Sequence, residues 1–325
     1  MESNLKEIAK RAGVSVTTVS RVLNNRGRIA QKTRQRILEL AHTRHCPRLV
    51  LIVLPASGEM LGWYTLTLLN AMELRATQLD YTLVWITSKD LVSLPEQNFF
   101  GIISFDYNNH LANFLGKRYA LPFVCLNDIG KPIDGICSVF SDEMNGMAQA
   151  INYLASYNHQ RIGLLTYGNP ETFANQSRHD SYLAMMERFG LKNHTKILHL
   201  NELAPYGTVK ELCENGITAI VNLSENTSCQ ILYALQFAGL RIPQDISLIA
   251  MELPYVSEFQ NPPLTTLEQN HTTLAAVAFD TLERIAQGER TSFTQPVPYL
   301  FHKRASVTFA RSRLCKSQMR EGKTF

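Results

Sequence analysis

Short apolar segments alternate with longer amphipathic segments from residue 49 onward, and this alternation limits the folds that the chain can adopt. Each apolar segment has the length of a buried β-strand, and the segments between them repeat apolar residues at helical spacing. Strand–helix–strand units of this kind close in a right-handed crossover and build a parallel sheet that helices cover on both faces. The predicted strands are 49–54, 81–86, 101–105, 122–126, 136–140, 161–166, 196–200, 217–221 and 247–251. The predicted helices are 64–79, 108–118, 143–157, 177–190, 207–215 and 226–239.

The alternation restarts near residue 160, which predicts two such sheets in two lobes that face each other. Ligands of open parallel sheets bind beyond the carboxyl ends of the strands, so the pattern favours a small-molecule site between the lobes. Periodicity alone leaves open a second interpretation, in which two domains pack together without a ligand.

The first 48 residues, which we call the headpiece, have a different pattern of three short helices. Gly13 follows the first helix and can take the positive φ of a tight turn. Ser15 has a hydroxyl that can cap the second helix, and a third helix follows around Ile37. Two helices joined by so tight a turn form a helix-turn-helix, whose second helix fits the major groove of B-DNA.

Positive charge is concentrated in the headpiece. It holds eleven Lys and Arg residues against three acidic residues, whereas the other 277 residues hold 21 basic and 25 acidic residues. A protein that neutralises DNA phosphates needs such a cluster of basic residues. The pattern leaves open a small basic domain that binds protein or is merely solvated.

Length and composition indicate a soluble protein with more than one domain. A chain of 325 residues is too long for one compact core, and 45% hydrophobic with 18% charged residues is ordinary for a globular protein. No apolar run approaches the length that spans a bilayer, and no apolar signal segment opens the sequence. The six cysteines show no paired spacing, which is typical of reduced thiols. We therefore expect a cytoplasmic protein that does not bind membranes.

Catalytic and cofactor-binding motifs are not found in the sequence. It has no Walker loop, no nucleophile elbow of the G-x-S-x-G type and no H-E-x-x-H pair. His42, His45 and Cys46 resemble metal ligands in type, but no second cluster at zinc-finger spacing accompanies them. We expect neither an enzyme nor a bound metal or cofactor.

Several segments, in the same order along nearly the whole chain, resemble the LacI/GalR family of bacterial repressors. In the headpiece they are LKEIA at 5–9 and AGVSVTTVSRVLN at 12–24. In the rest of the chain they are DEMNG at 142–146, NHQRIG at 158–163, SRHDSY at 177–182, GLRIPQDISLI at 239–249 and PPLTTL at 262–267.

This resemblance implies an all-α helix-turn-helix headpiece at 1–48 and an α/β, two-lobed core like that of periplasmic binding proteins at 49–325, with two parallel sheets. The chain of such a core crosses between the lobes three times, here near 157–160, 253–267 and 289–297. The expected N-lobe comprises about 49–157 and 268–290, the expected C-lobe about 158–255 and 296–310, and a basic tail 311–325.

The resemblance also implies which residues contact double-stranded operator DNA. Base edges are expected to meet Val16, Thr17 and Arg21 at the exposed start of the second helix. Arg21 can donate two hydrogen bonds to guanine, and Val16 and the Thr17 methyl group can pack on thymine methyl groups. Contacts to the phosphate backbone, which position without specifying, are expected from Thr18, Ser20, Asn24, Lys6 and Arg28.

A small-molecule effector, for which we expect a sugar, is implied between the lobes. The polar residues that match effector-binding positions of the family are Asp128, Gln176, Arg178, Ser224 and Glu252. A carboxylate opposite an arginine suits vicinal hydroxyl groups. A flat apolar platform for a sugar ring could come from Trp63, Tyr64 and Tyr206, although packing explains lone aromatic residues equally well. A non-sugar metabolite and a ligand-blind core are the alternatives.

The connection between headpiece and core departs from the family. Relatives have a Tyr-x-Pro-Asn step and then a hinge helix that opens the minor groove, whereas here His45-Cys46-Pro47 is followed at once by the strand at Leu49. About fifteen residues, or about four helical turns, are missing. Three outcomes compete: headpieces that dock rigidly on the core, an extended helix 32–44 that acts as a new hinge, or a decayed paralogue that binds DNA poorly. We favour the first.

Two DNA half-sites require a two-fold homodimer, and the resemblance places its interface on helices that include 64–79 and 226–239. The tail 311–325 has no heptad pattern, so a tetramer-forming coiled coil is not expected. The leading hypothesis is a repressor of a sugar-utilisation operon. A transport protein would lack the basic headpiece, an enzyme would need an acid–base pair or a phosphate loop, and an activator cannot be separated from a repressor by sequence.

Overall fold

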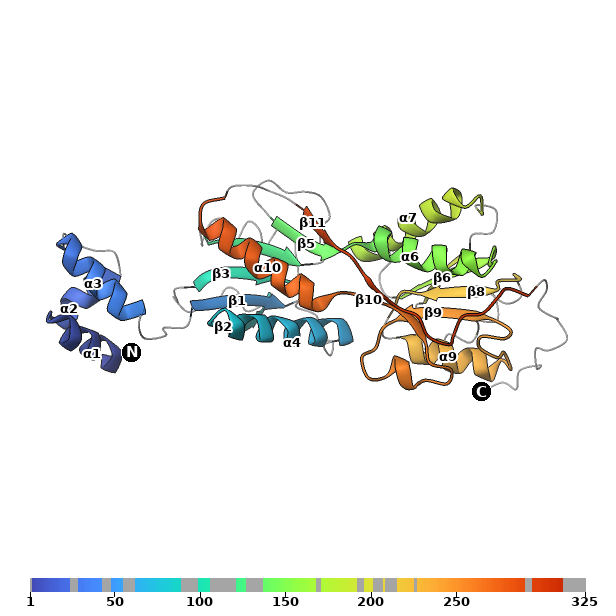
Figure 1. Cartoon of the computed structure of the whole chain (residues 1–325), viewed down its shortest axis with the longest axis horizontal. Coiled ribbons are helices and arrows are strands. Elements are labelled where there is room, and N and C mark those ends of the chain that lie inside the picture. The colour runs from blue at the N-terminus through green and yellow to red at the C-terminus, as the bar shows by residue number, and fades with distance from the viewer. Residues whose placement is uncertain are drawn as a thin grey trace.

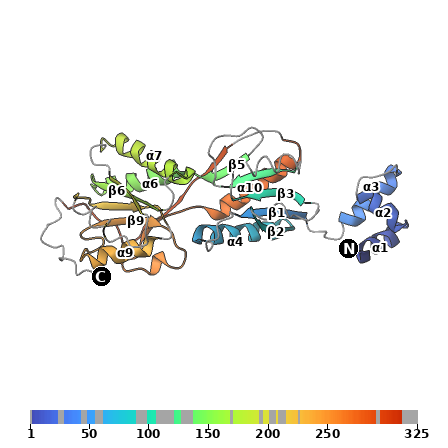
Figure 2. The ribbon, with the colours of Figure 1, turned by 180° about the vertical axis from the view of Figure 1, so that it is seen from behind.

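The computed structural model describes residues 2–23, 29–42, 48–54, 62–88, 99–105, 121–126, 137–167, 171–191, 196–200, 207, 215–224, 227–289 and 294–311. They form a helical headpiece and two α/β lobes that follow one another along the long axis (Figure 1). The headpiece lies beyond the N-lobe, on the side away from the C-lobe, as the view from behind also shows (Figure 2). The predicted helices 108–118 and, apart from Gly207 and Asn215, 207–215 lie outside the described residues.

The headpiece contains α1 (Glu2–Ala12), α2 (Val16–Leu23) and α3 (Gln31–His42). Gly13 closes the first helix with φ +70°, and the Ser15 hydroxyl accepts a hydrogen bond from the Thr18 amide at 3.1 Å. Both predictions about this turn are confirmed. The small core of the headpiece is built from apolar residues of all three helices, among them Ile8, Ala9, Ala12, Val19, Val22 and Ile37.

The N-lobe sheet has six parallel strands in the order β11-β5-β4-β3-β1-β2 within the described residues. Alternate residues of β1 enter different clusters, Val50 and Ile52 on the face covered by α4 (Trp63–Gln78) and α10 (His271–Ala286) and Leu51 on the other. The strands are β1 (Arg48–Leu54), β2 (Tyr81–Thr87), β3 (Phe99–Ser104), β4 (Phe123–Leu126), β5 (Cys137–Ser141) and β11 (Thr294–Val297).

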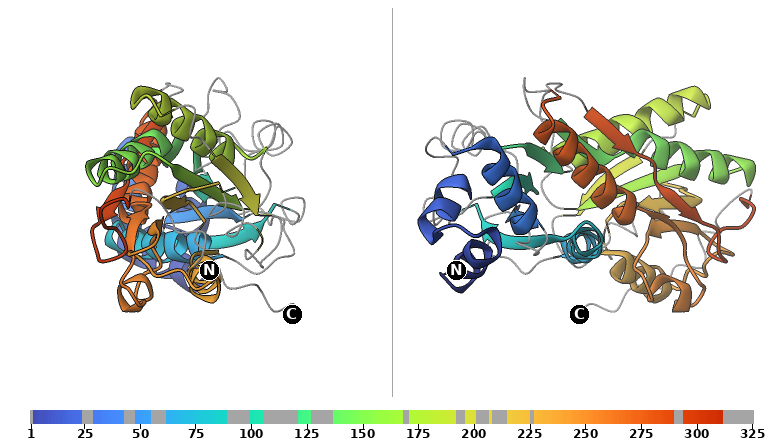
Figure 3. Two further views of the ribbon diagram at one scale, coloured as in Figure 1. Left: turned by 90° about the vertical axis from the view of Figure 1, so that its right-hand side faces the viewer. Right: turned by 60° about the vertical axis from the view of Figure 1, so that its left-hand side comes forward.

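Among the residues that the structure describes, the C-lobe sheet has the order β12-β10-β9-β8-β6-β7, with β12 antiparallel to β10 and the other neighbours parallel. Helices α6 (Glu143–Ser156) and α7 (Phe173–Arg188) pack on one face, and α9 (Ser228–Phe237) packs on the other (Figure 3). The strands are β6 (Ile162–Tyr167), β7 (Lys196–Leu200), β8 (Ala219–Asn222), β9 (Ser247–Met251), β10 (Thr265–Glu268) and β12 (Leu300–His302). A short 3-10 helix spans Ser257–Phe259.

The first crossing between the lobes differs from the prediction. The sequence pattern places helix 143–157 in the N-lobe, but α6 packs against the C-lobe. Its residues Met147, Ile151 and Leu154 join Leu164 and Tyr182 in one cluster there. The chain therefore crosses at 141–143 rather than at 157–160. The reason is that β5 ends at the lobe boundary and Asp142 caps α6 there, with its carboxylate accepting from the Asn145 amide at 2.9 Å.

The other two crossings are also shifted. β10 pairs with β9 in the C-lobe, so the second crossing falls at 269–270 instead of spanning 253–267. β11 pairs with β5 in the N-lobe and β12 with β10 in the C-lobe, so the third crossing falls at 298–299. The N-lobe thus extends to residue 297 rather than 290.

The carboxyl ends of the two sheets face each other. The crossings leave from the carboxyl ends of β5 and β11 on the N-lobe side and of β10 on the C-lobe side (Figure 1). Since the other strands of each sheet, β12 excepted, run parallel to these, the loops after them also lie at the boundary between the lobes. Residues that follow these strands are therefore placed where open α/β sheets bind ligands. No helix in the described part of the chain has the length and apolar character needed to cross a membrane.

Candidate functional site

The exposed face of α2 carries the residues predicted to read bases. Val16 is 37% exposed, and Thr17 and Arg21 are exposed beside it. Val19 and Val22 lie on the opposite face and are buried in the headpiece core. The helix therefore presents Val16, Thr17 and Arg21 outward, as insertion into a major groove requires.

The predicted phosphate contacts are placed less uniformly. Thr18 is half-buried and its hydroxyl lies 2.8 Å from that of Ser15, so it takes part in the cap of α2. Ser20 is half-buried and Lys6 is exposed on α1. Asn24 and Arg28 lie outside the described residues.

The connection from the headpiece to the N-lobe is short and its end is anchored. Five residues separate the last residue of α3 from Arg48, which begins β1. The Arg48 guanidinium donates to the Tyr81 hydroxyl at 3.2 Å and lies 4.8 Å from the centre of the Phe100 ring. The Tyr81 hydroxyl in turn donates to Glu283 at 2.8 Å, and burial and this carboxylate raise the pKa of Tyr81 to about 12. The connection is too short for a hinge helix of about four turns.

Arg178 lies in α7 and is held by a buried carboxylate. Its Nε donates to Glu143 Oε2 at 3.2 Å, and its Nη1 donates to the carbonyl of Leu223 at 3.0 Å. The other oxygen of Glu143 accepts from the Tyr299 hydroxyl at 2.9 Å, and burial, followed by the charge of Glu143, raises the pKa of Tyr299 well above its usual value. We call Glu143, Arg178 and Tyr299 the Arg178 cluster; it joins α6, α7 and the third crossing.

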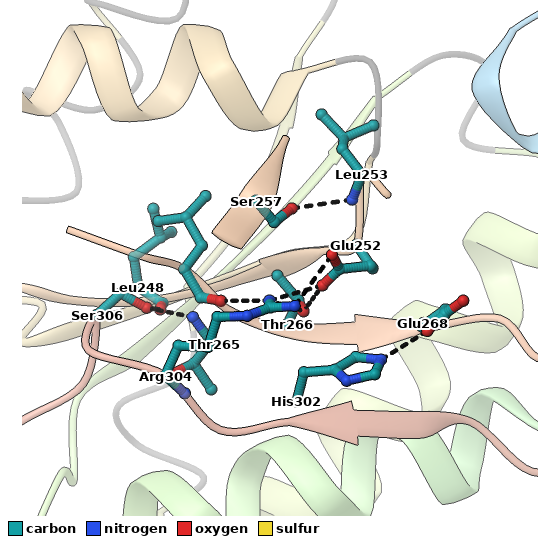
Figure 4. A network of polar contacts seen from close by, with 11 residues as sticks. Leu248, Glu252, Leu253, Ser257, Thr265, Thr266, Glu268, His302, Arg304 and Ser306 are labelled. Atoms are coloured by element: carbon teal, nitrogen blue, oxygen red, sulfur yellow. Dashed lines mark hydrogen bonds and ion pairs between the residues drawn. The ribbon is translucent and has the colours of Figure 1, made fainter. Parts of the chain in front are cut away.

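Glu252 follows β9 and is turned into the C-lobe (Figure 4). Arg304 donates to both of its oxygens, at 2.7 Å and 3.2 Å, and the Thr266 hydroxyl donates to one of them. The same arginine donates to the carbonyl of Leu264 at 2.7 Å. The carboxylate predicted to bind the effector is thus paired bidentately with an arginine within the protein.

The remaining predicted effector residues lie along the facing edges of the sheets, as far as they are described. Ser224 follows β8 and is half-buried, and Gln176 is exposed as the fourth residue of α7. Trp63, 45% exposed, and half-buried Tyr64 begin α4 on the N-lobe side. Asp128 and Tyr206 lie outside the described residues.

His271 is a polar residue of this region that sequence reasoning did not identify. It begins α10 directly after the second crossing, is 9% exposed, and packs against Tyr64 with ring centres 5.5 Å apart. Neither of its ring nitrogens has a hydrogen-bond partner among the described residues. Burial lowers the pKa of His271 to about 4. Glu143, Tyr299 and Arg304 were also missed, because the sequence offers no signal for side-chain partners so far apart along the chain.

Because the His271 imidazole is buried, we expect the free energy of unfolding to decrease in acid. The unfolded His271 side chain titrates near 6.5 and the folded one near 4, so the unfolded chain takes up its proton first as the pH falls. Its contribution to the free energy of unfolding is complete above pH 6.5 and is lost at about 1.4 kcal/mol per pH unit between 6.5 and about 4. His159, whose pKa is also lowered by burial, acts in the same direction. Urea unfolding at pH 7.0 and 5.0 should show a smaller pH effect in His271→Phe than in the wild type.

The exposed His179→Phe is the matched control and should keep the full pH effect. An unchanged pH effect in His271→Phe would show that the imidazole is not held neutral in the folded chain.

The three crossings are tied to one another by hydrogen bonds. Gln269 donates to the Ser141 hydroxyl at 3.0 Å, which joins the second crossing to the first. The amide of Tyr299 donates to Asn145 at 3.1 Å, which joins the third crossing to α6. A Cβ atom at Gly146 would lie 2.8 Å from the Tyr299 ring, so the close approach of the third crossing to α6 requires glycine there.

Two family models match the chain. The model of bacterial regulatory proteins, lacI family, matches residues 4–43, and that of the periplasmic binding protein-like domain matches residues 151–307. The HTH-type transcriptional regulator DegA of Bacillus subtilis (strain 168) is 27% identical over 320 residues, with 89% of this chain and 93% of that protein covered. The HTH-type transcriptional repressor PurR of Glaesserella parasuis serovar 5 (strain SH0165) is 28% identical over 315 residues, with 88% and 91% covered.

Solved structures of this fold agree with these matches. The lac repressor dimer bound to operator and the anti-inducer ONPF has a TM-score of 0.70 at 20% identity, with 93% of this chain and 98% of that chain covered. The complex of the transcriptional regulator CelR with cellobiose has a TM-score of 0.68 at 20% identity, with 93% and 99% covered. With a matching helix-turn-helix, a matching two-lobed core and regulators that align over most of its length, the chain belongs to the LacI family of DNA-binding transcriptional regulators.

Proposed function

We propose that this regulator is a repressor that binds operator DNA as a homodimer and releases it, or binds it more tightly, when a small sugar occupies the region between the lobes. The main support for operator binding is that Val16, Thr17 and Arg21 point outward from a helix whose other face is buried. Arg21 would supply hydrogen bonds to a guanine, and the two apolar groups would contact thymine methyl groups. Such a protein acts in the cytoplasm.

The effector site is supported by the residues along the facing sheet edges. Glu252 and Ser224 follow strands of the C-lobe, Arg178 lies in α7, and Tyr64 and His271 lie at the starts of α4 and α10 on the N-lobe side. Several polar groups beside an aromatic ring suit a sugar, whose hydroxyl groups need hydrogen bonds and whose C–H face packs on rings. The matched CelR structure holds cellobiose, which is consistent with a sugar here.

Exposed apolar residues on α4 and α9 support the homodimer. Leu66 and Leu74 on α4 are 51% and 61% exposed, and Tyr233 and Phe237 stack on α9 with ring centres 6.0 Å apart. These are the helices that the family resemblance places at the interface, and large apolar side chains on one surface favour association. The matched lac repressor structure is a dimer.

The short connection limits how far each headpiece can move from its own N-lobe. His42 and Arg48 are six Cα steps apart, so their Cα atoms can separate by no more than about 21 Å. With Arg48 anchored to Tyr81, a change in the relative position of the two N-lobes of a dimer would change the spacing of the headpieces. DNA affinity would then depend on lobe closure without an intervening hinge helix.

Binding to DNA from its own promoter region tests this function. Fluorescence anisotropy at physiological salt should show affinity at least about a thousandfold higher for a promoter duplex than for unrelated DNA. A thermal-shift screen with mono- and disaccharides should then identify an effector that changes the promoter affinity. Equal affinity for both duplexes, with and without the sugars, would refute the proposal. Specific DNA binding without any effector response would instead favour a ligand-blind regulator, in which the internal pairs of Arg178 and Glu252 take the place of a ligand.

A further inference from the structure

The charge of Arg178 is already balanced inside the protein. Its side chain is 14% exposed and that of its partner Glu143 is 5% exposed, so the pair is largely removed from water. Glu143 lies in the first turn of α6, where the helix dipole also favours a negative charge. Both of its oxygens accept hydrogen bonds, from Arg178 and from Tyr299, which keeps the carboxylate in place.

The charge of a second arginine in the same lobe, Arg304, is also balanced by a buried carboxylate, that of Glu252. Arg304 and Glu252 have side chains that are 19% and 6% exposed, and their closest N–O distance is 2.7 Å. In the described part of the C-lobe edge, each of these two guanidinium groups therefore contacts a buried carboxylate.

We propose that the part of the effector region at Arg178 accepts an uncharged group of the effector and rejects anionic groups such as the phosphate of a sugar phosphate, and that Glu143 determines this specificity. The inference rests on the proposed function, because it concerns the effector of that regulator. An anion that approached Arg178 would have to displace Glu143 and leave a buried carboxylate unpaired, or remain close to that carboxylate. An uncharged ligand leaves the charge balance intact and needs only hydrogen bonds.

Inorganic phosphate can test this discrimination against anions even though the effector is not identified. In the full-length wild type, the thermal shift caused by phosphate, relative to potassium chloride at the same ionic strength, should be no larger than in Arg178→Gln, since phosphate bound by the basic headpiece is common to both. In Glu143→Gln, which removes the carboxylate that Arg178 contacts at 3.2 Å, calorimetry should show phosphate binding at least tenfold tighter than in the wild type. The double variant Glu143→Gln/Arg178→Gln should lose the binding again.

The control is Asp180→Asn, which makes the same change in net charge on α7 at a side chain that is 81% exposed. This variant should gain no phosphate affinity. A wild-type phosphate shift that Arg178→Gln abolishes would overturn the proposal, and it would do so even if Glu143→Gln failed to fold. A folded Glu143→Gln variant that binds phosphate no more tightly than the wild type would overturn the proposal as well. Operator affinity measured on the same samples separates these results from a failure of the proposed repressor function.

Discussion

Replacing Arg21 with alanine is expected to lower affinity for the operator about 10- to 100-fold and to leave weak, salt-dependent binding to unrelated DNA nearly unchanged. The side chain is exposed on α2, while the helix is held in the headpiece core by Val19 and Val22, so the change should not unfold the domain. Anisotropy titrations on operator and scrambled duplexes over a range of salt concentrations measure both quantities.

Lys6→Ala provides the comparison, because this exposed cation lies on α1 and is expected to contact only the backbone. It should weaken binding to both duplexes equally. It should also reduce the slope of log affinity against log salt concentration by about one. If Arg21→Ala behaved in this way too, Arg21 would be a phosphate contact and not a reader of bases.

Arg304→Met is expected to destabilise the C-lobe by about 3–5 kcal/mol, because it leaves the buried carboxylate of Glu252 without its cation. The midpoint of thermal unfolding should fall by roughly 10 °C, measured by circular dichroism. The double variant Arg304→Met/Glu252→Leu should recover much of this loss, since no buried charge then remains unpaired.

Arg241→Met is the matched control for an ion pair near the surface. Arg241 donates to Asp245 at 2.8 Å, and its side chain is 58% exposed whereas that of Asp245 is 4% exposed. Without the Arg241 guanidinium, the Asp245 carboxylate keeps Arg311 at 3.5 Å and the backbone amide of residue 241 at 2.9 Å. Its loss should therefore change the midpoint far less than Arg304→Met. Similar midpoints for the two variants would mean that the pair of Arg304 and Glu252 is not protected from solvent.

Strand positions were largely predictable, because a buried strand is an apolar run with recognisable ends. The predictions 196–200 and 247–251 agree with β7 and β9 at both ends. α7 begins at Phe173, four residues before the predicted start, since the Thr172 hydroxyl caps it by accepting from the Asn175 amide at 3.3 Å. Phe173 and Ala174, which follow this threonine, have only polar residues three and four positions later, so apolar periodicity did not reveal the first turn of the helix.

The lobe that each helix joins was harder to predict. The apolar stripe of α6 shows that one face is buried but not which partner buries it, and the N-lobe sheet was an equally good partner by pattern. The partners of the candidate effector-binding residues were equally hard to predict. Arg178 and Glu252 were identified as candidate ligand contacts, whereas their partners Glu143 and Arg304 lie 35 and 52 positions away along the chain and became evident only in the fold.

The order in which the lobes are completed has a consequence during synthesis. α10 supplies Leu274, Phe279 and Leu282 to the N-lobe core, β11 forms an edge of its sheet, and β12 forms an edge of the C-lobe sheet. The headpiece core needs only α1 to α3, so on a translating ribosome it can fold long before either lobe has its last strand. A nonsense codon before His271 would consequently release a DNA-binding module that no metabolite controls.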